Sequence, residues 1–285
     1  MKRVVVLGAK GQLGLCIQEL SNAYPGLDFL FLDSKALDVS SAKQVETLFK
    51  STPFDYCINC AAYTAVDKAE DEKELAYKIN TLGVKFLAES CKKHQVTLIH
   101  ISTDFVFDGK STMPYKEEDK ENPLGVYGAS KLAGEKEIAI HLKNYFIIRT
   151  SWLYSVHGSN FVKTMLKLAK GRKELSIVND QKGTPTNAHD LAGVILKIIN
   201  SNASSYGVYH YSNLGHATWF EFAKAIFEMT HTKIKVNPVD SSQFRTKAER
   251  PKYSILDKTK IMNTFGIEIP AWEESLEKMV KVMQA

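Results

Sequence analysis

The 285-residue sequence has few cysteines, and their spacing argues against a metal site or a disulfide framework. Only Cys16, Cys57, Cys60 and Cys91 are present. Cys57 and Cys60 have the spacing of half a zinc site, but no second cysteine pair or nearby histidine pair completes the ligand set. Both lie in a short apolar stretch typical of a buried strand, where a free cysteine packs as a small hydrophobe. The sequence therefore predicts reduced thiols.

Long hydrophobic runs and a strong charge of one sign are also absent. No apolar run approaches the roughly 18 residues that cross a bilayer, and Val4–Leu7 is too short for the core of a signal peptide. We therefore expect a cytoplasmic protein without a membrane partner. The formal net charge is only +5, and basic residues alternate with acidic ones along the chain, which argues against a nucleic-acid partner.

Short β-branched runs alternate with amphipathic stretches through the first half of the chain. Lys2–Leu7 predicts a strand, followed by a glycine turn and a helix from Gly11. The alternation continues with strands at Phe29–Leu32, Tyr56–Cys60, Thr97–Ile101 and Tyr145–Thr150, and helices at Ala42–Phe49, Leu75–Cys91 and Tyr127–His141. Because hairpin turns are missing, this pattern predicts an α/β fold with a Rossmann-type doubly wound parallel sheet.

The second half alternates less regularly. Its expected helices lie near Asn160–Ala169, His189–Asn200, Thr218–Met229 and Trp272–Met283. We expect residues 1–150 to form a dinucleotide-binding domain and residues 151–285 to form mainly a smaller, C-terminal substrate-binding lobe. Part of 172–200 is expected to pack back on the Rossmann sheet. No linker or repeat separates the halves, so we expect two lobes around one cleft.

Gly8, Gly11 and Gly14 follow the first predicted strand and open the first predicted helix. Glycines there permit a tight turn, and the N–H groups at the helix start attract a pyrophosphate. Asp33 follows the second strand, where an acidic side chain accepts hydrogen bonds from the adenosine ribose of NAD or only caps a turn. Lys35 is placed to pair with the ribose phosphate of NADP. The pattern predicts a nicotinamide dinucleotide, NADPH or NADH.

Tyr127 and Lys131 are four residues apart on a predicted helix, so their side chains share one face. A nearby cation favours the charged form of tyrosine and is expected to lower the pKa of the phenol from about 10. Thr103 ends a predicted strand, where its hydroxyl either caps a turn or binds the same carbonyl oxygen as the phenol. Together with the glycine loop, these three residues indicate carbonyl reduction.

The chain resembles the extended short-chain dehydrogenase/reductases, and within them the dTDP-4-dehydrorhamnose reductase family, over essentially its whole length. The matching blocks are Cys60–Glu70, Ile101–Gly109, Val126–Glu135, Arg149–Tyr154, Asn160–Met165 and Asn179–Thr186. The resemblance implies reduction of the C4 ketone of dTDP-4-dehydro-L-rhamnose with hydride from NAD(P)H. It also implies that Tyr127 donates the proton, that Lys131 binds the nicotinamide ribose and tunes Tyr127, and that Thr103 assists.

The resemblance also implies binding residues. With the glycine loop, the expected cofactor contacts are Gly8, Gly11, Gln12, Leu13, Asp33, Asp38, Val39, Ala62, Tyr63, Thr64, Tyr127 and Lys131. The expected substrate contacts are Thr103, Asp104 and Trp152, and Arg245 and Arg250 are candidates for the diphosphate, unless they are only solvated charges.

Two departures from the family pattern bear on function. Phe105 stands where the family often has tyrosine, which removes a hydroxyl near the sugar. Some members carry magnesium at a dimer interface, but the positions that align with its carboxylate ligands hold Cys16 and His189 here. We therefore expect no metal, while a homodimer is allowed.

Two other functions share parts of this pattern. Nucleotide-sugar epimerases and dehydratases share the fold and the Tyr–Lys pair, but dehydratases need an Asp–Glu pair after the threonine, and Asp104 is followed by Phe105 here. Related proteins also act as regulatory subunits of methionine adenosyltransferase and bind the dinucleotide without known turnover. Retention of Thr103, Tyr127 and Lys131 together favours a working catalyst.

Overall fold

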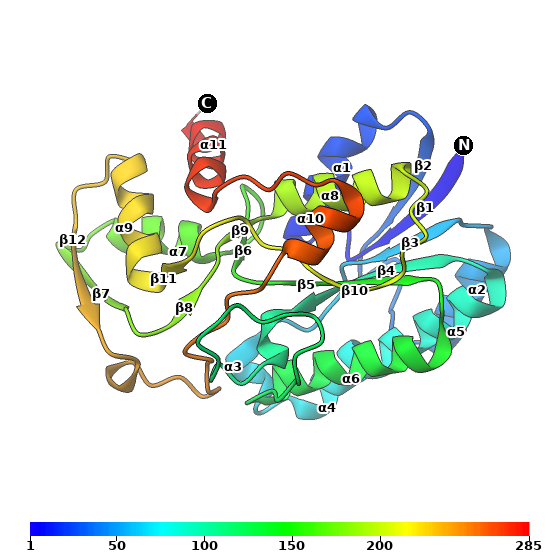
Figure 1. Ribbon diagram of the computed structural model, residues 1–285, viewed down its shortest axis with the longest axis horizontal. Helices are drawn as coiled ribbons and strands as arrows, with labels where there is room; N and C mark the ends of the chain where they lie inside the picture. Colours follow the sequence, from blue (N-terminus) through cyan, green and yellow to red (C-terminus); the bar gives the residue numbers. More distant parts are fainter. Residues whose placement is uncertain (285) are drawn as a thin grey trace.

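Six parallel strands form the central sheet of the computed structural model, which describes residues 1–284 (Figure 1). They are β1 (Lys2–Leu7), β2 (Leu27–Leu32), β3 (Tyr56–Asn59), β4 (Thr97–Thr103), β5 (Tyr145–Thr150) and β10 (Gly207–His210). Their order is β10-β5-β4-β3-β1-β2. Val4, Val5 and Val6 of β1 are fully buried because helices cover both faces of the sheet. The predicted doubly wound parallel sheet is confirmed.

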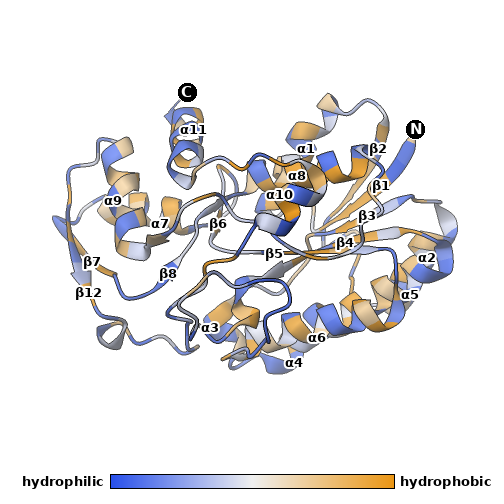
Figure 2. Ribbon diagram, in the orientation of Figure 1, coloured by the Kyte–Doolittle hydropathy of each residue, from blue (hydrophilic) through white to orange (hydrophobic). Residues whose placement is uncertain are grey.

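The two helical layers bury opposite faces of this sheet. One contains α1 (Gln12–Leu20), α8 (Ala188–Asn200) and α10 (Thr259–Phe265), and the other contains α2 (Ala42–Ser51), α5 (Val84–His94) and α6 (Val126–His141). Side chains alternate in direction along each strand, so Val4 packs with the first layer and Val5 with the second. Hydrophobic colours accordingly dominate the central strands in Figure 2.

The helix predicted at Leu75–Cys91 is divided in the structure. α3 (Val66–Ala69) and α4 (Lys73–Tyr77) precede a π-helical segment, Lys78–Gly83, and α5 follows it. Periodicity alone does not distinguish a continuous helix from one with such a segment, and π segments often occur at functional sites.

A separate apolar cluster organises much of the second half. It contains the helices α7 (Phe161–Ala169), α9 (Trp219–Met229) and α11 (Trp272–Gln284), which pack on the strand pair β7 (Glu174–Val178) and β12 (Lys235–Val239). Two short pairs complete it: β6 (Leu153–Tyr154) with β9 (Thr186–Asn187), and β8 (Lys182–Gly183) with β11 (Ala217–Thr218). Short 3-10 turns lie at Ser21–Ala23, Asp104–Val106 and Ser241–Gln243. The chain crosses between the two parts repeatedly, because α8, β10 and α10 belong to the central layers.

The strand order places a ligand-binding crevice between β1 and β3. From β1 the chain moves to β2 on one side and then to β3 on the other, so the loops after β1 and β3 diverge. Ligands of open α/β sheets bind at this topological switch point, outside the carboxyl ends of the strands.

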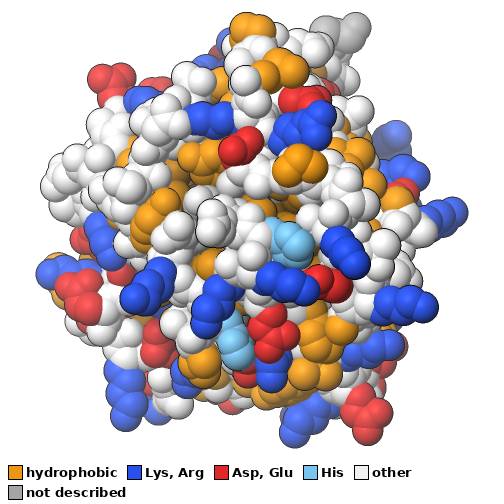
Figure 3. All heavy atoms as spheres, turned by 90° about the vertical axis from the view of Figure 1, so that its right-hand side faces the viewer, with side chains coloured by type: hydrophobic (Ala, Val, Ile, Leu, Met, Phe, Trp, Pro, Cys, Tyr) orange, Lys and Arg blue, Asp and Glu red, His pale blue; other side chains and the backbone are white. Residues whose placement is uncertain are grey.

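The surface carries charges of both signs. On the face shown in Figure 3, Lys and Arg side chains are interspersed with Asp and Glu. Within residues 1–284, none of the helices has both the length and the apolar character that crossing a membrane requires.

Candidate active site

The loop between β1 and α1 contains glycines where a side chain would collide with the backbone. Gly8 has φ +74°, and a Cβ there would lie 2.7 Å from the backbone nitrogen of Ala61. A Cβ on Gly14 would lie 2.6 Å from a backbone carbon of the loop. α1 starts at Gln12 after Gly11, with no acidic residue in its first turn. Its first N–H groups lack intrahelical partners, and the positive end of the helix dipole is left for an anion.

One cleft of about 570 Å³ connects this loop with the start of α6 and with the separate apolar cluster that contains α7, α9 and α11, called the second apolar cluster below. Ten of the residues predicted from the sequence line it: Gly11, Gln12, Leu13, Ala62, Thr64, Thr103, Asp104, Tyr127, Lys131 and Trp152. Five other predicted cofactor residues are outside the lining: Gly8, Asp33, Asp38, Val39 and Tyr63. The structure thus brings the two proposed chemistries, dinucleotide binding and carbonyl reduction, into one space.

Asp33 lies directly after β2 and already has a cationic partner. Its carboxylate forms an ion pair with Lys10 of the glycine loop and accepts hydrogen bonds from the N–H groups of Lys35 and Ala36, both at 3.0 Å. The hydrogen bond from Lys10 and those from the backbone lower the pKa of Asp33. The cation that contacts this carboxylate is therefore Lys10, and Lys35 contributes its backbone N–H.

The remaining predicted cofactor residues outside the lining act through other contacts. The Asp38 carboxylate accepts hydrogen bonds from the backbone and hydroxyl of Ser40, at 2.9 and 2.7 Å, and these lower its pKa. Val39 is buried in the core layer of α2 and α5. The Tyr63 phenol donates to Glu72 at 2.7 Å, so its side chain is directed at that carboxylate.

Asn80 in the π-helical segment fixes the loop after β3. Its side-chain oxygen accepts from Tyr63 N at 2.9 Å and its amide nitrogen donates to Tyr63 O at 3.0 Å. The same nitrogen lies 3.0 Å from the Ser130 hydroxyl on α6. Because Asn80 is 1% exposed, this bridge is shielded from water and joins the loop after β3 to α6.

Tyr127 is fixed between α6 and the end of β4. Its ring packs edge-on against Phe105, with centroids 5.6 Å apart, and a Cβ on Gly128 would overlap the carbonyl of Phe105. Burial raises the pKa of Tyr127 to about 12, although a hydrogen bond with Thr103 acts in the opposite direction. The expectation that Lys131 lowers this pKa is therefore not met. The phenol is neutral at physiological pH, the state that a proton donor needs.

Lys131 is turned toward β4. Its Nζ donates to Ile101 O at 2.7 Å and lies 3.1 Å from His100 Nε2. Ala61 N–H donates to Asn59 Oδ1, which leaves Asn59 Nδ2 to donate to His100 Nδ1 at 3.0 Å. A neutral His100 then carries its proton on Nε2, facing Lys131, and this arrangement favours the amine form of Lys131.

The protonation states agree with that geometry. Burial lowers the pKa of Lys131 to about 8, although Glu135 and Cys60 act in the opposite direction. Burial also lowers the pKa of His100 well below its usual value, and the charge of Lys131 lowers it further. Lys131 therefore exchanges a proton near neutral pH.

Asp104 presents a buried acceptor to the cleft. It is 2% exposed, and its Oδ2 has no hydrogen-bond partner among residues 1–284. Burial raises the pKa of Asp104 to about 6. Thr103 donates to the other carboxylate oxygen at 3.1 Å. An unpartnered carboxylate oxygen at this depth is costly unless a ligand supplies a donor.

A buried ion pair holds α6 against β5 below these residues. Arg149 is 1% exposed and donates to Glu135 and to Glu121, both at 2.7 Å. The Ser102 hydroxyl also donates to Glu135. The two elements that carry catalytic candidates, β4 and α6, are thus fixed relative to each other and to β5.

Trp152 forms an aromatic wall with Trp219. Their rings stack with centroids 3.5 Å apart and an interplanar angle of 7°. Trp152 has φ +45°, a conformation uncommon for a bulky residue, and a Cβ on Gly183 would lie 2.5 Å from its indole. Both indoles line the cleft. Backbone strain of this kind is often found at functional sites, where surrounding contacts hold the residue in place.

The two candidate arginines differ. Arg250 lines the cleft and pairs with Asp67 at 2.8 Å. Arg245 is exposed and lines a neighbouring surface cavity instead. Arg250 and Trp219 also line an apolar cavity of about 540 Å³ that includes Phe161. The structure therefore favours Arg250 as the cation nearer the cleft.

Among the residues at this site that were not predicted are Asn59, Asn80, His100 and Trp219. Each acts on a residue far from it along the chain, and no local spacing marks it. The only sequence signals are a polar residue inside each of two apolar strands, Asn59 and His100, which hydrogen bonding must satisfy.

Known proteins share this architecture over the whole chain. The family model described as "RmlD substrate binding domain" matches residues 1–285. A dTDP-4-dehydrorhamnose reductase from Sinorhizobium fredii is 41% identical over 98% of this chain and 96% of its own length. A crystal structure of a dTDP-4-dehydrorhamnose reductase from Clostridium acetobutylicum has a TM-score of 0.96 and 40% identity, covering 99% of this chain and 100% of that one.

A further crystal structure carries a cofactor. The dTDP-4-dehydrorhamnose reductase from Bacillus anthracis, in complex with NADP, has a TM-score of 0.94 and 43% identity over 100% of this chain and 99% of its own. With a family model over every residue, relatives near 40% identity and a common fold, the chain belongs to the RmlD family of dTDP-4-dehydrorhamnose reductases.

Proposed function

We propose that this protein reduces the C4 ketone of dTDP-4-dehydro-L-rhamnose to the alcohol, giving dTDP-L-rhamnose, at the expense of NAD(P)H. The observation that carries this proposal is the single cleft that contains both the glycine loop and the group Thr103, Tyr127 and Lys131. Membership of the family supports the same reaction.

The cofactor fits the residues present. The glycine loop has no room for side chains at Gly8 and Gly14, and the N-terminus of α1 provides unpaired N–H groups for the pyrophosphate. Asp33 follows β2 and pairs with Lys10 of the loop, and we assign this pair to the adenosine ribose. When bound, NAD(P)H supplies a hydride to the carbonyl carbon.

Proton transfer is assigned to the chain itself. The neutral Tyr127 phenol donates its proton to the carbonyl oxygen, so that hydride and proton together convert the ketone to the alcohol. We assign the Thr103 hydroxyl a second hydrogen bond to this carbonyl oxygen, for which its proton turns away from Asp104. Lys131 binds the ribose of the cofactor and, with a pKa of about 8, is suited to return a proton to Tyr127.

The sugar nucleotide is assigned to the opposite wall of the cleft. The stacked indoles of Trp152 and Trp219 provide an apolar surface, and the unpartnered oxygen of Asp104 accepts a hydrogen bond from a sugar hydroxyl. Arg250 supplies positive charge for the diphosphate. We further propose that residues 1–150 mainly bind the dinucleotide and residues 151–285 mainly bind the substrate.

The direct test is to mix the purified protein with enzymatically generated dTDP-4-dehydro-L-rhamnose and follow NADPH and NADH oxidation. We expect oxidation that depends on the sugar nucleotide, with dTDP-L-rhamnose as product. If the protein binds NADPH but does not oxidise it, the reductase proposal fails and a regulatory role takes its place. Light scattering of the same preparation tests whether the protein is a homodimer.

A further inference from the structure

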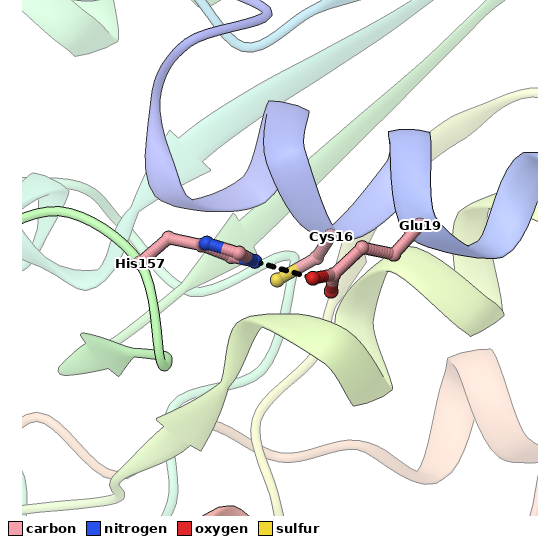
Figure 4. A group of neighbouring side chains, drawn as sticks. All are labelled: Cys16, Glu19 and His157. Atoms are coloured by element: carbon pink, nitrogen blue, oxygen red, sulfur yellow. Dashed lines mark hydrogen bonds and ion pairs between the residues drawn. The ribbon is translucent and has the colours of Figure 1, made fainter. Parts of the chain in front are cut away.

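One group of potential metal ligands lies between α1 and the segment that follows β6 (Figure 4). Cys16 and Glu19 are three residues apart on α1 and therefore share a face of the helix. His157 approaches them from the second half of the chain. One ligand atom from each side chain lies within 4.8 Å of the other two, and His157 Nε2 is 2.9 Å from Glu19 Oε1.

The segment that carries His157 is held against α1 by hydrogen bonds. The Ser155 hydroxyl and the Asn160 amide both donate to Gln12 Oε1, at 3.0 and 2.9 Å. His157 N–H donates to the Ser155 hydroxyl at 3.1 Å. Such outer contacts orient ligands before a metal binds. They also connect this group to Gln12, which lines the cofactor cleft.

The donor set selects the type of ion. Magnesium binds oxygen ligands, whereas a thiolate, an imidazole and a carboxylate together suit Zn²⁺, with water in the fourth position. Cys16 is 1% exposed, and the Glu19 side chain is 48% exposed, so an ion has access from the solvent side. The histidine close to Cys16 is His157, and not His189, which aligns with a magnesium ligand of some family members.

We infer that Cys16, Glu19 and His157 form a Zn²⁺ site that clamps residues 155–160 to α1. The site is independent of the proposed reductase function. It revises the expectation of no metal, which considered only Cys16 and His189.

Zinc affinity should rise with pH because binding displaces a proton from the thiol. The charged groups nearest to the thiol are Glu19 on the same helix and Asp190 on α8. Each unit of pH is therefore expected to strengthen binding by up to about tenfold for the one proton released from the thiol.

The test uses the untagged, chelator-treated full-length protein with Zn²⁺ and with Co²⁺ as a spectroscopic probe. We expect one equivalent to bind, a rise in Tm, and a thiolate-to-Co²⁺ charge-transfer band. Loss of an outer contact costs about 10–100-fold in metal affinity, so removing a direct ligand should cost about 100-fold or more. Cys16→Ser should also abolish the charge-transfer band.

Controls separate the site from general effects. Cys91→Ser removes another buried thiol and His216→Gln another histidine, and both should bind zinc like the parent protein. The exposed Glu19→Gln guards against a folding failure of the Cys16 variant and should weaken binding by itself. Stoichiometric binding that survives Cys16→Ser and Glu19→Gln, no binding at all, or equal competition by Mg²⁺ would overturn the inference.

Discussion

At the scale of single residues, we expect turnover to depend most on the buried Tyr127 phenol. We expect Tyr127→Phe to lower kcat by about 10²–10⁴-fold, the usual contribution of general acid catalysis. NADPH binding should be retained, because the ring still packs against Phe105. Steady-state kinetics and a cofactor titration measure the two effects. Tyr145→Phe on β5 is the control, and near-normal turnover in Tyr127→Phe would refute the assignment.

Cofactor choice depends on the ion pair of Asp33 and Lys10. The Asp33 carboxylate repels a ribose phosphate, while Lys10 attracts it, so we expect both NADH and NADPH to be used. Asp33→Ala should move the preference toward NADPH by releasing Lys10. Asp28→Ala is the control, because Asp28 lies on β2 in an exposed ion pair with Arg3 of β1. An unchanged ratio of the two dissociation constants would show that Asp33 does not reach the ribose.

We expect the ionised carboxylate of Asp104 to lower the stability of the folded protein while it contributes to substrate binding. Its pKa is raised to about 6, so at pH 8 the buried carboxylate is ionised at a cost of about 2–3 kcal/mol relative to the unfolded chain. As pH falls through 6 the native carboxyl takes up its proton first, and this cost disappears near pH 4. Asp104→Asn removes the charge, so it should raise Tm at pH 8, with no gain near pH 4, and weaken substrate binding. Thermal unfolding at both pH values tests this.

Residues whose partners are close along the chain were predicted from spacing alone, whereas Asp104 and Trp152 were predicted only through the family resemblance. Tyr127 and Lys131 are one helical turn apart, and the glycine loop is a continuous motif. The environment that sets their protonation comes from elsewhere. Burial, which depends on packing of the whole molecule, raises the pKa of Tyr127, and the opposing contribution comes from the hydrogen bond with Thr103. His100 contacts Lys131 and Asn80 contacts Ser130 from distant parts of the chain, and no local pattern marks either residue.

At the scale of elements, Gly128 and Gly134 let α6 pack closely against its neighbours. This close packing positions the proposed catalytic residues Tyr127 and Lys131. A Cβ on Gly134 would overlap the carbonyl of Asn80, and α6 also contacts the π-helical segment through Thr81. Periodicity predicted a helix at Leu75–Cys91 but not the π segment, because that distortion depends on the close contact with α6.

Gly134→Ala is therefore expected to destabilise the protein by about 1–3 kcal/mol, since backbone must move to admit the methyl group. Gly193→Ala on α8 is the matched control, because nothing lies within 4 Å of the added Cβ. That substitution should stabilise by about 0.5–1 kcal/mol. Urea unfolding gives both values, and equal effects at the two positions would contradict the packing argument.

At the scale of the whole molecule, the candidate active site lies where the second apolar cluster meets the central sheet and its helices. Local patterns predicted the parallel sheet because its strands are apolar and alternate with helices. They did not predict β10 and α10 in the central layers, since each depends on contacts with strands or helices far away in sequence. The repeated crossings of the chain bring the aromatic wall of Trp152 and Trp219 into one cleft with Tyr127 and Lys131 of α6.

The joining of the two parts leads to a prediction on Trp152, which packs against the second cluster and lines the same cleft as Tyr127. Trp152→Ala removes half of the stacked pair with Trp219, so the sugar nucleotide loses its apolar wall. The glycine loop and Lys131 are not altered. We expect kcat/KM for dTDP-4-dehydro-L-rhamnose to fall by about 10–200-fold, the range for 1–3 kcal/mol of lost contact, while the NADPH dissociation constant changes less than about threefold. Phe265→Ala, a half-buried aromatic of the central layers, controls for lost stability. Equal losses of NADPH binding and turnover in Trp152→Ala would place this indole in the cofactor site instead.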